Sequence, residues 1–218
     1  MTKRSQIVFV VDDDERLCDA LGELLASHGI EAMTFRSAGE YMTADKPDIP
    51  ACLILDVELP DINGLDLQRR VTQGAHPPIV FITGHGDIPS TVRAMKGGAL
   101  DFLAKPFSED ALMASVRTGI AQDRAERSAR VEIASLRRRY LTLSPREREV
   151  LPLVVSGLLN KQAAAELGIS EVTLQLHRRN VMQKMEAASL ADLVRFAERL
   201  GVSSISPQRK GRADHERG

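Results

Sequence analysis

The chain has 218 residues, a hydrophobic fraction of 43% and a formal net charge of −1 at pH 7. This length and composition suit a folded protein with room for two ordinary domains, and they exclude a chain that is disordered throughout. The charge is uneven, because residues 1–106 hold 10 Lys and Arg against 16 Asp and Glu, whereas residues 141–218 hold 12 against 9. The acidic first half suggests a cation as partner, and the basic second half suggests a polyanion.

The cysteines and the N-terminus bear on the cellular compartment. Cys18 and Cys52 lie in helical or apolar settings with no second pair of metal ligands nearby, which predicts buried thiols in a reducing compartment. Lys3 and Arg4 are followed by only five apolar residues, 7–11, which are too few for the apolar core of a signal peptide. No stretch of the chain approaches the length of a membrane span. We therefore expect a cytoplasmic protein without membrane contact.

The first half of the chain alternates short apolar runs with helical patterns. Five strands interleaved with helices predict an α/β fold, a doubly wound five-stranded parallel sheet of the flavodoxin-like type. In the strand order 2-1-3-4-5, the first and third strands are neighbours, and Asp12 and Asp13 come to lie beside Asp56. The predicted strands cover 7–11, 32–35, 52–56, 79–83 and 100–103, and the first helix covers 15–27.

Polar side chains follow the ends of these strands. Taken alone, Asp56 is more typical of a residue that caps the next turn than of a reactive group, and residues 12–14 are typical of an acidic helix start. Three carboxylates at one edge, however, need a raised pKa or a cation, and oxygen ligands favour Mg²⁺ or Ca²⁺. Thr83 and Lys105, after the fourth and fifth strands, add a hydroxyl and an ammonium suited to phosphoryl oxygens. The set predicts Mg²⁺-assisted transfer of a phosphoryl group to a carboxylate.

Residues 5 to 120 resemble the receiver domain of two-component response regulators. The resemblance rests on Val10-Val11-Asp12-Asp13, Leu55-Asp56, Ile82-Thr83-Gly84 and Phe102-Leu103-Ala104-Lys105-Pro106. It implies that Asp56 accepts a phosphoryl group from a sensor histidine kinase. It further implies that Asp13, Asp56 and the backbone carbonyl of Glu58 hold Mg²⁺, with Asp12 in the outer shell. Thr83 and Lys105 would bind the phosphoryl oxygens, and the Lys105–Pro106 bond would be cis.

The same resemblance makes Thr83 and Phe102 a switch pair, in which the ring follows the hydroxyl inward. Phe102 is also typical of an ordinary core aromatic. Phosphorylation would reshape the face formed by the fourth helix, the fifth strand and the fifth helix, and a homodimer would form there. The loop from Thr83 to Pro89 resembles that of the nitrogen-fixation (FixJ) and styrene-response (StyR) regulators. His85 is expected to be a loop residue and not a general base. By the resemblance, His85 and, outside this loop, Glu58 stand at positions where members of the family tune the lifetime of the phosphoryl group.

A long helix is predicted from the N-cap Ser108 to about Arg139, with no Gly or Pro after Gly119. Beyond Ile120 its apolar positions become sparse. Both a solvated helical linker and a dimerising stalk therefore remain open.

Four closely spaced, capped helices follow residue 141 and predict a helix-turn-helix bundle, the first of them opened by a capping box at Ser144 to Glu147. In the third helix, which begins after Ser170, the spacing separates a core face from a basic face that carries amides and is typical of a major-groove reader. The core face holds Leu174, Val181 and Met185, and the basic face holds Gln175, Arg178, Arg179 and Met182.

Residues 141 to 200 resemble the LuxR-type DNA-binding domain, and the resemblance rests on residues 143–151, 157–161 and 170–177. It implies that Gln175, Leu176 and Arg179 face base edges. It places Lys161, Thr173, His177 and Lys184 near phosphates. Two positions depart from the family, since Gln175 stands where Lys is common and Ala163 where Ile is common.

These observations predict a cytoplasmic transcriptional regulator in which phosphorylation of Asp56 controls DNA binding. We expect a receiver domain (1–122), a helical linker (123–140), a DNA-binding domain (141–202) and a polar, disordered tail (203–218). The partners would be a sensor histidine kinase, promoter DNA, RNA polymerase and a second copy of the chain. The chain would accept and hydrolyse its own phosphoryl group without being a dedicated enzyme.

Two other functions remain as alternatives. One is a DNA-binding regulator that works without phosphorylation. The other is an aspartate-nucleophile phosphotransferase, although those enzymes place Asp-x-Asp after the first strand, whereas Asp56-Val57-Glu58 follows the third.

Overall fold

The computed structural model describes residues 5–84 and 88–202. The chain divides into two compact units, Met1–Ser128 and Ala129–Gly218, and each is described by itself. The predictions for His85 and for the tail 203–218 lie outside the described residues. No helix within the described ranges combines the length and the apolar character needed to cross a membrane.

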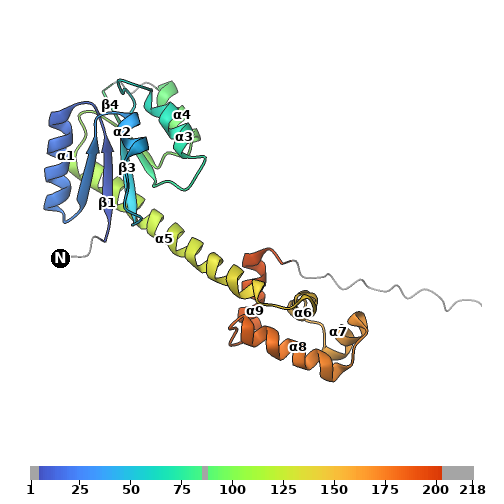
Figure 1. The fold of residues 1–218 in the computed structure, drawn as a ribbon. Helices are drawn as coiled ribbons and strands as arrows, with labels where there is room; N and C mark the ends of the chain where they lie inside the picture. Colours follow the sequence, from blue (N-terminus) through green and yellow to red (C-terminus); the bar gives the residue numbers. More distant parts are fainter. Residues whose placement is uncertain (1–4, 85–87, 203–218) are drawn as a thin grey trace, which may run out of the picture. The chain divides into compact units, whose positions relative to one another are not determined.

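The first unit is built on a parallel sheet in the order β2-β1-β3-β4-β5, as predicted (Figure 1). Val11 lies opposite Leu55 in the β1–β3 register, so the residues that follow them, Asp12 and Asp56, reach the same edge of the sheet. The predicted fifth strand was one residue early. The strands are β1 (Ile7–Val11), β2 (Glu31–Phe35), β3 (Ala51–Asp56), β4 (Ile79–Thr83) and β5 (Asp101–Ala104).

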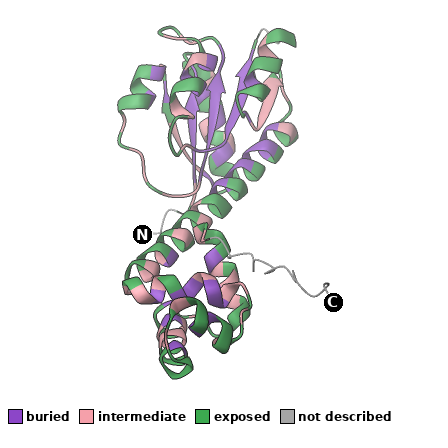
Figure 2. Ribbon diagram, turned by 90° about the vertical axis from the view of Figure 1, so that its right-hand side faces the viewer, coloured by how far each residue is buried: buried purple, intermediate pink, exposed green. Residues whose placement is uncertain are grey.

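Two hydrophobic clusters hold the sheet between layers of helices. Successive side chains of a strand point to opposite faces, and β1 accordingly gives Phe9 to one cluster and Val10 to the other. Helices α2 (Ala38–Thr43), α3 (Gly64–Val71) and α4 (Ile88–Lys96) cover the first face, and α1 (Glu15–Ser27) with the start of α5 covers the second. The central strands are buried throughout (Figure 2), which explains their unbroken apolar sequences.

Both cysteines are free and buried, as predicted. Burial raises the pKa of Cys18 to about 11 and that of Cys52 to about 12. Both are therefore neutral thiols that fill the core.

Helix α5 (Glu109–Leu141) is a single helix of 33 residues that belongs to both units. Its first half places Leu112, Val116 and Ile120 in the core of the first unit. Farther along, Leu136 is buried, whereas Val131 is exposed.

The described part of the second unit contains α6 (Pro145–Val155), α7 (Asn160–Leu167), α8 (Glu171–Lys184) and α9 (Leu190–Leu200). The predicted capping box is present at the start of α6, where the Ser144 hydroxyl and the Glu147 carboxylate each accept a hydrogen bond from the other residue's backbone N–H. Gly168 adopts a left-handed conformation with φ of 64° and ends α7, so that α8 begins after a tight turn. Leu151, Leu174 and Val181 lie in the common core of these helices.

Candidate functional site

Three carboxylates gather at the carboxyl edge of the sheet. Asp12 and Asp56 are buried and Asp13 is exposed, and one ligand oxygen of each lies within 4.8 Å of the others. Asp14 does not join them, because its carboxylate accepts from the backbone N–H groups of Arg16 and Leu17 and caps α1. The acidic run is thus divided between a helix cap and a cluster whose oxygens are suited to a divalent cation.

Lys105 connects two of these carboxylates. Its ammonium donates to Asp12 Oδ2 at 2.7 Å and to Asp56 Oδ2 at 2.8 Å. Burial alone would lower the pKa of Lys105, but its hydrogen bonds to the two carboxylates outweigh burial and raise it. Burial raises the pKa of Asp12 in spite of the neighbouring ammonium. The Lys105–Pro106 bond is cis, as the resemblance implied.

The remaining residues predicted for this site lie around Asp56 and Lys105. Thr83 ends β4 and is fully buried. The backbone N–H of Glu58 donates to Asp56 Oδ1 at 3.1 Å, which places the start of the β3–α3 loop directly against the carboxylate. Phe102 is half-buried, and its ring centroid lies 6.1 Å from that of the buried Phe81. A hydroxyl, an ammonium and carboxylates therefore end neighbouring strands, and an aromatic residue lies at the border of the core.

Gly64 also shapes this site, and the sequence reasoning did not single it out. A Cβ atom at this position would lie 2.1 Å from the carbonyl oxygen of Asp56. Its backbone N–H donates to Val57 O at 2.8 Å, and Asn63 caps the helix that begins here. The turn-rich sequence around Asn63 was the available signal, but the contact with Asp56 depends on the tertiary structure.

Helix α8 carries all of the predicted DNA-contact residues except Lys161, which lies on α7. Its core face is as predicted, since Leu174, Val181 and Met185 are buried. Gln175, Leu176 and Arg179 are exposed, as are Lys161 and Thr173, while His177 is half-buried.

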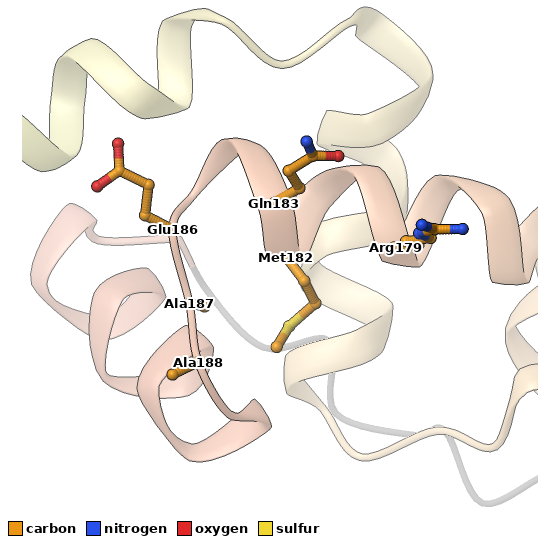
Figure 3. Close-up of a pocket in the computed structure, with 6 residues that line it drawn as sticks. All are labelled: Arg179, Met182, Gln183, Glu186, Ala187 and Ala188. Carbon is orange, nitrogen blue, oxygen red and sulfur yellow. The ribbon is translucent and has the colours of Figure 1, made fainter.

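The placement of Met182 on the outer face was wrong. Its side chain is half-buried and packs against the core of the unit. Met182 and Arg179 leave α8 in different directions at a shallow hollow beside the end of the helix (Figure 3). Met182 lies only one residue after the buried Val181, so the core face of α8 is wider than the strict periodicity suggested.

Two of the predicted DNA contacts have partners within the second unit. Arg178 donates to Asn160 Oδ1 at 3.0 Å and joins α8 to the first turn of α7. The Lys184 ammonium donates to the buried Glu147 Oε2 at 2.7 Å and joins the end of α8 to α6. From the sequence, Glu147 was predicted only as part of a capping box, because spacing along the chain gives no signal of its pair with Lys184.

Comparison with known proteins gives matches along most of the chain. The model of the response regulator receiver domain matches residues 8–117, and that of the luxR family of bacterial regulatory proteins matches residues 141–197. Nodulation protein W of Bradyrhizobium diazoefficiens is 51% identical over 91% of this chain and 88% of its own length. Response regulator protein TodT of Pseudomonas putida is 43% identical over 92% and 88%.

Two solved structures of similar length also match. The response regulator StyR superposes with a TM-score of 0.79 at 46% identity, covering 89% of this chain and 98% of that structure. Full-length FixJ from B. japonicum superposes with a TM-score of 0.52 at 38% identity, covering 92% of this chain and 98% of that structure.

Proposed function

The chain belongs to the two-component response regulators, in which a receiver domain precedes a LuxR-type DNA-binding domain, and on this premise we propose that Asp56 is the phosphoacceptor that controls DNA binding by α8. A sensor histidine kinase would donate the phosphoryl group, and promoter DNA would be bound by the second domain. The observation that carries the proposal is the ammonium of Lys105 held against both Asp12 and Asp56 at one edge of the sheet.

The chemistry follows from the charges at this edge. An Asp56 oxygen attacks phosphorus, the new O–P bond replaces the bond to the donor nitrogen, and that nitrogen takes up a proton. Lys105, which already contacts Asp56, neutralises the charge of the incoming oxygens, and the buried hydroxyl of Thr83 donates to another.

Oxygen ligands converge where a Mg²⁺ ion would be needed. Asp13, Asp56 and the backbone carbonyl of Glu58 would hold the ion, with Asp12 beside them, and the converging carboxylate oxygens fit this choice of metal. The ion, when bound, would neutralise charge on the transferring phosphoryl group.

The output would pass from Thr83 to Phe102 and then to the surface of α4, β5 and α5. An apolar stripe on α4 supports the proposal that two copies meet there, because Ile88, Val92 and Met95 follow one face and are 79%, 44% and 46% exposed. Dimerisation would place two α8 helices on neighbouring half-sites, from which the protein would act on RNA polymerase. We propose residues 1–122 and 141–202 as the two domains, with 123–140 as the linker.

The test measures acid-labile phosphate and DNA affinity together on the full chain. A labelled small phosphodonor with Mg²⁺ should modify the wild type and Asp66→Asn, a control that changes a half-exposed carboxylate on α3, but not Asp56→Asn. DNA affinity should rise with phosphate only in the two labelled proteins. Label on Asp56→Asn would mean that another residue is the acceptor, and equal affinity with and without label would leave a regulator that works without phosphorylation.

A further inference from the structure

An outward-facing row of side chains runs along α8. Val172, Leu176, Arg179 and Gln183 are spaced by four, three and four residues, and all are exposed. Such spacing keeps side chains on one face of a helix, and this face lies opposite the buried Leu174, Val181 and Met185.

The first two members of this row are large and apolar. Val172 is 76% exposed and Leu176 is 57% exposed, and neither belongs to the hydrophobic core of the second unit. Val172 is the second residue of α8 and follows the N-cap Ser170 by two positions. A β-branched residue gains nothing here from helix propensity, and among the described residues its side chain joins no hydrophobic cluster.

We propose that Val172 and Leu176 contact the C5 methyl groups of thymines in the major groove, so that the chain selects thymine at defined positions of its half-site. The inference rests on the proposed DNA-binding function and adds Val172 to the predicted base contacts. The N-terminal residues of a recognition helix are those that reach base edges, and Val172 and Leu176 lie in its first two turns. The thymine methyl is the apolar group that base pairs present in this groove.

The neighbouring residues favour DNA over a protein as the occupant. Arg179 continues the same row one turn farther along, and Gln175 lies beside it; both side chains are suited to hydrogen-bonding base edges. An apolar pair followed along the helix by a guanidinium would favour thymines next to a guanine in the bound sequence. Neither Val172 nor Leu176 can bind a phosphate, because both side chains lack a hydrogen-bond donor.

The experiment begins with selection of duplexes from a random-sequence pool by the full chain, with beryllofluoride and Mg²⁺ as the phosphoryl mimic. Each thymine of the selected site is then replaced by deoxyuridine, which keeps its base pairing and loses only the methyl group. Loss of one buried methyl contact should weaken binding about fourfold. We expect this loss at one or two positions in each half-site.

Variants of the protein show which residue contacts each methyl group whose removal weakens binding. Val172→Ala should bind the thymine and deoxyuridine duplexes alike at one position, and Leu176→Ala at its neighbour, with folding checked by circular dichroism. Val131→Ala is the matched control, because that valine is 68% exposed on α5 and should keep the full deoxyuridine effect.

The possible outcomes distinguish a failure of the methyl contact from a failure of the proposed DNA-binding function. Selected sites that tolerate deoxyuridine at every position would overturn the methyl contact while leaving DNA binding intact, and would assign the apolar pair to a protein partner. A deoxyuridine effect unchanged in Val172→Ala would remove Val172 from the contact. A pool that yields no enriched sequence would overturn the proposed function, and the inference with it.

Discussion

The pair formed by Glu147 and Lys184 should hold the recognition helix in place, and Glu147→Gln tests this role. Glu147 is only 3% exposed, and its Oε2 accepts both from Lys184 Nζ at 2.7 Å and from the backbone N–H of Ser144 at 2.8 Å. Glutamine keeps the shape of the side chain and an oxygen that accepts from Ser144. The substitution therefore removes the charge and retains the helix cap.

The expected loss follows from the exposure of the two partners. A hydrogen bond between charged groups contributes about 1.5–3 kcal/mol to stability. The Lys184 side chain is 38% exposed, so its ammonium regains water in the variant and escapes most of the penalty for a buried, unpaired charge. We expect Glu147→Gln to lower the free energy of local opening at the end of α8 by about 1–2 kcal/mol.

Hydrogen exchange measured by mass spectrometry on the full chain can follow α8 separately from the first unit. The amides of the last turns of α8 should exchange faster in Glu147→Gln, and DNA affinity should fall with them. Glu149→Gln is the control two residues away on the same helix, because Glu149 forms an exposed surface pair with Arg146 and should change exchange little. Equal exchange of α8 in the two variants would refute a role for the buried pair in positioning this helix.

The same pair predicts a pH dependence. Burial alone would raise the pKa of Glu147, but the Lys184 ammonium and the Ser144 N–H outweigh burial and hold the pKa below its ordinary value of 4.5. A carboxyl group whose pKa is lowered in the folded state contributes stability that is fully present above its unfolded pKa and is lost as the pH falls through its folded pKa. The difference between wild type and Glu147→Gln should therefore be constant near neutral pH and shrink below pH 4.5.

Three other substitutions, the first with a matched control, have defined outcomes. Gly64→Ala should lower the midpoint of urea unfolding and slow phosphoryl uptake, because the added Cβ would lie 2.1 Å from the Asp56 carbonyl oxygen. Gly22→Ala is the control, since a Cβ added there meets no atom within 4 Å and should stabilise α1 by about 0.5–1 kcal/mol. Gln175→Lys should steepen the dependence of DNA affinity on salt by about one unit of slope, and an unchanged slope would place residue 175 away from DNA. Asp123→Asn should destabilise the first unit by about 2 kcal/mol in urea unfolding, because this fully buried carboxylate accepts from the first backbone N–H of β3 and from a guanidinium on α5.

Much of the fold was readable from local patterns. The apolar runs, the helical spacing and the cap residues depend on neighbours a few positions away, so the order of strands and helices followed from the sequence. The carboxyl ends of parallel strands meet at one edge, and this geometry alone predicts that Asp12, Asp13 and Asp56 lie together.

The tertiary structure decided how the charged residues are paired. Lys105 contacts Asp56 across 49 positions and Asp12 across 93, and Lys184 contacts Glu147 across 37. Local spacing carries no information on such pairs, because they form only when separate elements pack against each other. The sequence by itself therefore determined which chemical groups end the strands and line α8, whereas packing decided which charged groups pair and that Met182 turns towards the core.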